Sequence, residues 1–229
     1  MRLDKFVCKS TDLTRTEAVE KIQSGVVSVN GTPIQDEAKQ VHENNCITLN
    51  SSILVARPFR YIMLHKPADT ICSNIDEVYP SLFKYLDIDN SSELHIAGRL
   101  DADTTGMVLI TDDGRWSYHI TRPTTLCTKV YRVGLSRPIN DNAAEQFKQG
   151  VQLQGESQLT HPAELVVLHP KEVLLTITQG KFHQVKRMFA AVGNRVVSLH
   201  REAIGGVCLD VEVKQWRYLS DAEILQLSY

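Results

Sequence analysis

A polar loop that runs directly into an apolar strand constrains this chain more than any other stretch of its sequence. Gly98 and Gly106 bracket an arginine and two carboxylates, in the order Gly-Arg-Leu-Asp-Ala-Asp-Thr-Thr-Gly, and an apolar run follows at 107–111. An Asp-Asp-Gly turn signal at 112–114 then ends that run. Because glycine lets the backbone bend sharply or approach a ligand closely, Asp101 can be presented at the entrance of a strand, as catalytic groups are. Two solvated acids in a polar loop would carry the same spacing.

Length and composition allow one larger domain and a small module. The 229 residues can bury a sizeable core. No apolar run approaches the roughly 18 residues of a membrane span, and the N-terminus has no signal-peptide pattern. The five cysteines have no metal-ligand spacing and support neither a disulfide framework nor a zinc site. We expect a cytoplasmic protein whose net charge of −2 leaves nucleic-acid contact to local basic patches.

Residues 1–58, including a linker that begins near 51, are expected to form the small module. An apolar face around Phe6 predicts a first helix, and capping-box spacing at 14–17 starts a second helix that Gly25 ends. Asn30-Gly31 is a type I′ hairpin signal between two short strands. The predicted order is therefore helix, helix, hairpin.

This order, with basic residues on its helical half, is similar to the small RNA-binding module of the S-four type, also called the αL motif. In that module the basic residues of the helices meet structured RNA. The resemblance makes Arg2, Lys5 and Arg15 candidates for RNA binding. Charge alone leaves a solvated helix pair as the alternative, because nearby acids almost balance the bases.

The remaining residues, 59–229, alternate strand and helix signals and predict an α+β domain. Apolar or alternating runs predict strands at 61–64, 107–111, 128–135, 162–167, 173–177, 196–201 and 205–209. Helical spacing predicts helices at 81–86, 116–122, 140–149 and 180–193.

The stretch 181–201 is a local basic region. It contains five Lys or Arg residues, two histidines and no carboxylate. Such a face suits a phosphate backbone, and Lys181, His183 and Arg187 are its candidates for RNA contacts. A solvated helix flank is the alternative, which the missing acids disfavour.

Three stretches in this order resemble the motifs of pseudouridine synthases that modify ribosomal RNA. They are the loop at 98–106, the Lys-x-Tyr strand at 129–131, and Gly-Lys-x-His-Gln-Val-Lys-Arg-Met at 180–188. The resemblance implies a catalytic domain with a mixed, mainly antiparallel sheet at 59–229. A strand followed by Lys66-Pro67 also resembles a motif of this family whose role is mainly structural, so Lys66 is assigned no chemistry.

The resemblance also assigns the catalytic roles. Asp101 is the implied nucleophile, and Lys186 is the cation that pairs with it, although many relatives carry Arg, whose planar fork Lys lacks. Tyr131 is implied to pack against the target base and to take part in proton transfer. Without the resemblance, Tyr131 would be interpreted as an ordinary core tyrosine. Arg99 is the candidate to fill the position that a flipped base vacates, and a salt bridge within the loop is its alternative.

The expected activity is the isomerisation of a uridine to pseudouridine, without metal, nucleotide or redox cofactor. The Thr104-Thr105 pair and the His-Gln-Val-Lys-Arg form favour the small-subunit branch, with uridine 516 of the 16S rRNA as the expected target. The expected partner is 16S rRNA or a small-subunit assembly intermediate, bound by a monomer. The alternatives are a family member acting on large-subunit rRNA, a catalytically inactive ribosome-assembly RNA-binding protein, and a glycosidase using Asp101 and Asp103.

Overall fold

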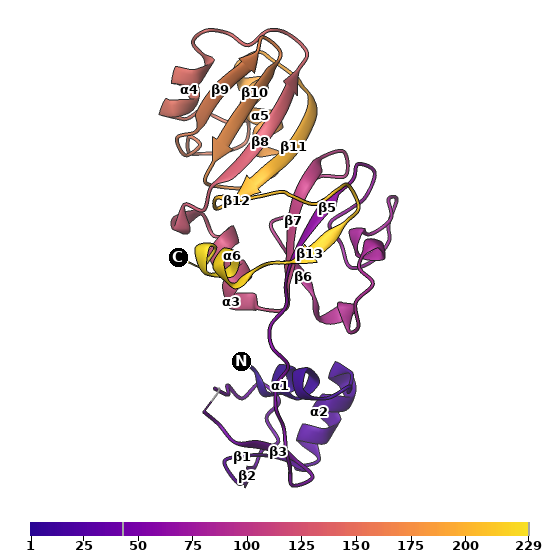
Figure 1. Cartoon of the computed structure of the whole chain (residues 1–229). Helices are drawn as coiled ribbons and strands as arrows, with labels where there is room; N and C mark the ends of the chain where they lie inside the picture. The colour runs from indigo at the N-terminus through magenta and orange to yellow at the C-terminus, as the bar shows by residue number, and fades with distance from the viewer. Residues whose placement is uncertain (43, 229) are drawn as a thin grey trace. The chain divides into compact units, whose positions relative to one another are not determined.

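The structure is a computed structural model that describes residues 1–42 and 44–228. Its chain divides into two compact units, Met1–Pro58 and Phe59–Tyr229, each with its own hydrophobic core (Figure 1). None of the described helices is long and apolar enough to cross a membrane.

The smaller unit packs two helices against a small sheet. The helices are α1 (Leu3–Ser10) and α2 (Arg15–Gln23), and the sheet has the order β2-β1-β3-β4, formed by β1 (Val27–Val29), β2 (Thr32–Pro33), β3 (Ile47–Leu49) and β4 (Ser52–Ile53). The Thr14 hydroxyl accepts from the Glu17 amide and the Glu17 carboxylate accepts from the Thr14 amide, so the predicted capping box is confirmed. Asn30 and Gly31 both have positive φ, as a type I′ turn requires.

The larger unit is built on a mixed sheet with the order β13-β5-β7-β11-β8-β10-β9, to which β6 is added beside β7 and β12 beside β11. Its strands are β5 (Tyr61–Lys66), β6 (His95–Ala97), β7 (Thr105–Thr111), β8 (Lys129–Leu135), β9 (Glu164–His169), β10 (Glu172–Ile177), β11 (Val196–Ile204), β12 (Val207–Cys208) and β13 (Trp216–Tyr218). β7 and β11 pair in parallel, whereas the other neighbouring strands pair antiparallel. The α+β class with a mixed, mainly antiparallel sheet is therefore confirmed.

Helices cover the sheet in two groups. The α-helices are α3 (Gly114–Thr121), α4 (Ala143–Gln149), α5 (Gln184–Ala191) and α6 (Asp221–Gln226), and 3-10 turns lie at η1 (Leu82–Tyr85), η2 (Ser91–Glu93) and η3 (Pro123–Thr125). Figure 1 shows α4 and α5 with the β8–β10–β9 part of the sheet, and α3 and α6 at the end of the sheet near β12.

Strand β7 is buried on both faces and joins two hydrophobic clusters. Val108 and Ile110 pack in the cluster that includes α4 and α5, whereas Met107 and Leu109 pack in the cluster that includes α3 and α6. Alternate residues of a strand point to opposite faces, so the continuous apolar run is what a strand covered on both sides requires. This burial anchors the polar loop that precedes β7.

The structure explains why the second of the two bracketing residues, Gly106, is a glycine. It has a φ of +110°, and a Cβ there would overlap the backbone carbonyl of Arg201 on the parallel neighbour β11. Only glycine allows both the dihedral angle and this close approach.

Two predicted helices begin later than their sequence signals suggested. The helix expected from Gly180 begins at Gln184, because His183 has a φ of +49°, which cannot continue a right-handed helix. The helix expected from Asn140 begins at Ala143. The apolar face of α5, with Val185, Met188 and Phe189, packs in the core.

Candidate active site

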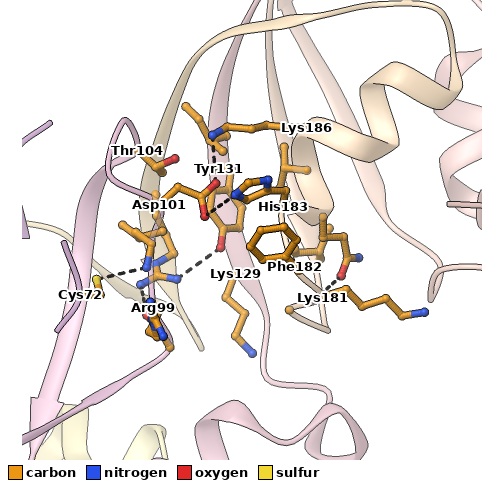
Figure 2. Close-up of a pocket in the computed structure, with 18 of the residues that line it drawn as sticks. Cys72, Arg99, Asp101, Thr104, Lys129, Tyr131, Lys181, Phe182, His183 and Lys186 are labelled. Carbon is orange, nitrogen blue, oxygen red and sulfur yellow. Dashed lines mark hydrogen bonds and ion pairs between the residues drawn. The ribbon is translucent and has the colours of Figure 1, made fainter. Parts of the chain in front are cut away.

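A cavity of about 690 Å³ opens in the larger unit where the loop 98–104, strand β8 and the turn before α5 meet. Asp101, Tyr131 and Lys186, the three residues that the sequence indicated as catalytic, all line it (Figure 2). A cavity of this size is typical of sites that hold a small molecule or one unit of a polymer. The tertiary structure thus brings residues from three distant motifs together.

The Asp101 carboxylate is ion-paired with Lys186. The Lys186 Nζ lies 2.9 Å from Asp101 Oδ2, although the two residues are 85 positions apart in the chain. α5 presents Lys186 to the cavity because its apolar side is packed in the core. The ion pair therefore fixes the position of the Asp101 carboxylate in the cavity.

Lys186 also binds Asp103, an ion pair that sequence reasoning did not anticipate. Its Nζ lies 2.7 Å and 2.9 Å from the two carboxylate oxygens of Asp103. Partial burial lowers the pKa of Lys186, but hydrogen bonds with Asp103 and Asp101 outweigh burial, so the pKa lies above its ordinary value. The hydrogen bond from Lys186 in turn lowers the pKa of Asp103. Lys186 therefore stays charged beside two carboxylates.

Tyr131 lies at the inner wall of the cavity and is oriented by Arg201. Arg201 Nη1 donates to the Tyr131 hydroxyl at 3.3 Å, while Nε and Nη2 donate to the carbonyls of Met107 at 2.8 Å and Gly98 at 2.7 Å. Arg201 is only 2% exposed. Arg201 thus connects β11, β7, β8 and the start of the loop 98–104.

Arg201 is a site residue that the sequence analysis missed, because it was counted only as part of the basic region at 181–201. The signal was the period of two in β11, since Arg201 follows the buried Leu199 by two residues and so points to the same face.

Lys66 fixes the backbone of the loop 98–104. It is fully buried at the end of β5, and its Nζ donates to the carbonyls of Pro67 at 3.0 Å, Ala102 at 3.1 Å and Thr104 at 2.8 Å. Burial lowers the pKa of Lys66. The hydrogen bonds fit the structural role expected for the Lys-Pro motif, because Ala102 lies between Asp101 and Asp103 and Thr104 follows Asp103.

Lys66→Met should therefore destabilise the protein and disorder the loop. Methionine fills a similar volume but removes the Lys66 donor of the Thr104 carbonyl, whereas the carbonyls of Pro67 and Ala102 keep a second donor from Thr70 and Asp69. We therefore expect the free energy of unfolding to fall by about 2 kcal/mol. Urea denaturation followed by circular dichroism measures the change. The control Lys171→Met removes an exposed lysine and should stay within about 0.5 kcal/mol of the parent. Equal stability of the two variants would contradict the role of Lys66.

The known proteins most relevant to this site are RNA-modifying enzymes. Residues 60–191 match the family described as RNA pseudouridylate synthase, and residues 1–45 match the S4 domain. The chain belongs to the RNA pseudouridylate synthase family. The pseudouridine synthase recognised from its motifs is thereby confirmed, together with its amino-terminal S4 module.

The similarity to members of this family extends over the whole chain. The chain is 47% identical to the ribosomal small subunit pseudouridine synthase A of Vibrio cholerae, over 99% of each protein. It is 45% identical to the protein of that name from Escherichia coli, over 98% of each. A crystal structure of a pseudouridylate synthase matches with a TM-score of 0.73 and 42% identity, covering 99% of both chains.

The glycosidase alternative does not fit this pseudouridylate synthase site. A glycosidase needs a carboxylic acid whose pKa is raised, so that it can donate a proton. Here both Asp101 and Asp103 are ion-paired with one lysine, and the pKa of Asp103 is lowered.

Most basic side chains of the region 181–201 are ion-paired or buried, which the sequence did not indicate. Glu156, which precedes the region, accepts from Lys181 Nζ at 2.8 Å and from Arg187 Nη1 at 3.2 Å. Lys186 is paired with carboxylates and Arg201 is buried. The expectation that balancing acids are missing is therefore wrong, because the acids come from elsewhere in the chain. Lys181 and Arg187 remain partly exposed near the cavity.

The other candidate RNA-binding residues lie on exposed surfaces. Arg99 is exposed in the loop 98–104, and Lys5 is exposed on α1. Arg2 and Arg15 both bind the buried carboxylate of Asp4, at 3.0 Å and 3.1 Å, and Arg15 keeps 67% of its side chain exposed. Asp4 thus holds two guanidinium groups together on one side of the smaller unit.

Within the described ranges, no cluster of three or more His, Cys, Asp or Glu side chains could hold a metal ion. Among the candidates for RNA contacts, His183 lines the cavity and lies next to Asp101. Its Nε2 is 3.4 Å from Asp101 Oδ1, and its ring stacks on Phe182 (Figure 2).

Proposed function

We propose that this chain converts a uridine of small-subunit ribosomal RNA to pseudouridine, with Asp101 as the nucleophile and uridine 516 of the 16S rRNA as the target. The observation that carries the proposal is the Asp101–Lys186 ion pair, inside a cavity that Tyr131 also lines. The Vibrio cholerae and Escherichia coli relatives are named for the small subunit, which favours it over the large subunit.

The reaction breaks the bond between N1 of uracil and C1′ of the ribose, turns the base, and joins C5 to C1′. The proton on C5 is lost and N1 gains one, so the product is an isomer of the substrate. Asp101 can attack the sugar or the base carbon, or it can remove a proton on a glycal route. All three courses need the carboxylate in a fixed orientation, and the ion pair with Lys186 supplies that orientation.

Tyr131 is suited to hold the detached uracil. Its ring lines the cavity and its hydroxyl is fixed by Arg201, so the ring can pack against the base while the hydroxyl relays the C5 proton. The base must not leave between the two bond changes, and the cavity must keep water from C1′.

The target base has to leave the RNA stack to reach Asp101, at a cost of a few kcal/mol. Arg99 is exposed in the same loop as Asp101 and can occupy the position that the base vacates. Lys181, His183 and Arg187 lie beside the cavity, where they can bind the flanking backbone.

The experiment that tests this function is incubation of the purified protein with ribosomal RNA, followed by mapping of pseudouridine at single-base resolution. We expect one new pseudouridine, at uridine 516 of the 16S rRNA. A product only in large-subunit rRNA would support the large-subunit alternative, and binding without product would support the inactive RNA-binding protein. The presence of Asp101, Tyr131 and Lys186 in one cavity favours activity.

The physiological partner is proposed to be 16S rRNA or a small-subunit assembly intermediate in the cytoplasm. A monomer suffices for catalysis, because the cavity is lined by residues of a single chain. Comparing free 16S rRNA, a partly assembled particle and the complete subunit as substrates identifies which is modified.

The S4 module is proposed to dock the RNA and to take no part in the chemistry. A truncated protein starting at residue 59 keeps the whole cavity, so it should fold and bind RNA more weakly. On duplex-like RNA, the slope of log K against log salt should shrink by roughly 0.9 for each phosphate that the truncated protein no longer neutralises. Titration at several salt concentrations measures both quantities, and an unchanged slope would contradict docking by Arg2, Lys5 and Arg15.

A further inference from the structure

Phe182 is an exposed aromatic residue at the rim of the catalytic cavity. Its side chain is 76% exposed, although it lies among the residues that line the cavity. The ring is stacked on that of His183, with centroids 3.8 Å apart and planes inclined by 22° (Figure 2). His183 Nε2 in turn lies 3.4 Å from Asp101. An aromatic pair thus extends from the catalytic carboxylate to the surface.

The turn that carries Phe182 is held by its neighbours. The Lys181 amide donates to Gln184 Oε1 at 2.8 Å, and Arg187 Nη1 donates to the Phe182 carbonyl at 3.0 Å. The carboxylate of Glu156 ties the side chains of Lys181 and Arg187 together. His183 takes the left-handed φ of +49° that ends the turn. The exposed position of the Phe182 ring is therefore imposed by a fixed backbone.

An exposed ring on a fixed turn has a physical use in an RNA-modifying enzyme. Unpaired bases stack on aromatic side chains, and this stacking tolerates any base because each has a π-face. The position of Phe182 at the rim distinguishes it from Tyr131, which is only 8% exposed and lies where the target base is expected. The nucleotide next to a flipped uridine stays outside the cavity, close to its rim, where Phe182 lies.

We infer that the Phe182–His183 pair is a stacking platform for an unpaired nucleobase adjacent to the target uridine. This inference rests on the proposed function, because it presumes that RNA delivers a uridine to Asp101. The platform positions the RNA chain, and the 3.4 Å contact of His183 Nε2 with Asp101 Oδ1 links the occupied platform to the reacting group.

The test combines variants of the protein with RNA substrates that lack one base. Phe182→Leu keeps an apolar side chain but has no π-face, whereas Phe182→Trp keeps the face. The matched control is Tyr218→Leu, because Tyr218 is half exposed on the edge strand β13 and does not line the cavity. Binding constants are measured on a substrate RNA hairpin and on versions with an abasic site at each position flanking the target.

We expect Phe182→Leu to bind the intact RNA about 10-fold more weakly, and Phe182→Trp and Tyr218→Leu to bind it like the parent. An abasic site at one of the flanking positions should weaken RNA binding by the parent protein about 10-fold. The same abasic site should leave RNA binding by Phe182→Leu unchanged. The platform would be overturned if Phe182→Leu bound the intact RNA as tightly as the parent. It would also be overturned if every abasic site weakened RNA binding by Phe182→Leu as much as it weakens binding by the parent.

The same design separates this inference from the proposed function. If the parent binds the hairpin but forms no pseudouridine, the proposed function fails while the binding cycle still decides the platform. If the parent forms pseudouridine and Phe182→Leu binds and reacts identically, only the platform fails.

Discussion

Asp101→Asn is expected to yield a folded protein that binds the target RNA and forms no detectable pseudouridine, a decrease in turnover on the order of 10,000-fold or more. Asparagine is nearly isosteric but has neither the charge nor the nucleophilicity of a carboxylate. The loop should persist, because Lys66 holds its carbonyls and Lys186 keeps Asp103 as a partner. We therefore expect a change in unfolding free energy of only about 1 kcal/mol. Pseudouridine mapping and RNA titration of the variant measure the two effects.

Asp103→Asn is the matched control for this prediction. It removes the same charge from the same loop and also weakens the hold on Lys186, so a partial decrease in turnover is expected. Asp103 is more exposed than Asp101, with side-chain exposures of 70% and 30%, so its carboxylate is the one less enclosed by the cavity. Substantial product from Asp101→Asn, or equal decreases in both variants, would contradict a nucleophilic role for Asp101.

Lys186→Met is expected to reduce turnover by about 100- to 1,000-fold while leaving RNA affinity mostly unchanged. Methionine keeps the length of the side chain but leaves Asp101 and Asp103 without their shared cation. Because the pKa of Lys186 lies above its ordinary value, the ion pair persists through the neutral and mildly alkaline range. Single-turnover rates at saturating RNA separate this effect from binding.

Two further variants serve as comparisons for Lys186→Met. Lys186→Arg should retain part of the activity, because arginine also carries a permanent charge and can bind a carboxylate through two donors. Lys148→Met removes an exposed lysine on α4 and should behave like the parent. If Lys186→Met turned over as fast as Lys148→Met, Lys186 would be an ordinary surface base.

Local signals predicted the secondary structure well, because each acts over a few neighbouring residues. The capping box of Thr14 and Glu17 spans one helical turn, and Asn30-Gly31 supplies the positive φ angles of its hairpin. The apolar run at 107–111 predicted a strand, and the structure shows that this strand, β7, is packed on both faces. The prediction was wrong at the start of α5, because the left-handed conformation of His183 leaves no periodic signal.

The candidate residues of the site could be named from motifs, but their partners could not. Sequence spacing gave no reason to pair Lys186 with Asp103. No acid was expected to balance Lys181 and Arg187, yet both donate to Glu156. Arg201 was interpreted as a surface base, yet it is buried and orients Tyr131.

Chain order and residue type thus determined the domain class, the secondary structure and which side chains have chemistry to offer. Only the tertiary structure decided which charged side chains form ion pairs with one another. The Asp101–Lys186 pair joins residues 85 positions apart, and Lys66 and Arg201 are satisfied by carbonyls from distant strands and loops. The physical reason is that periodicity and capping depend on neighbours along the chain, whereas charge compensation and burial depend on neighbours in space.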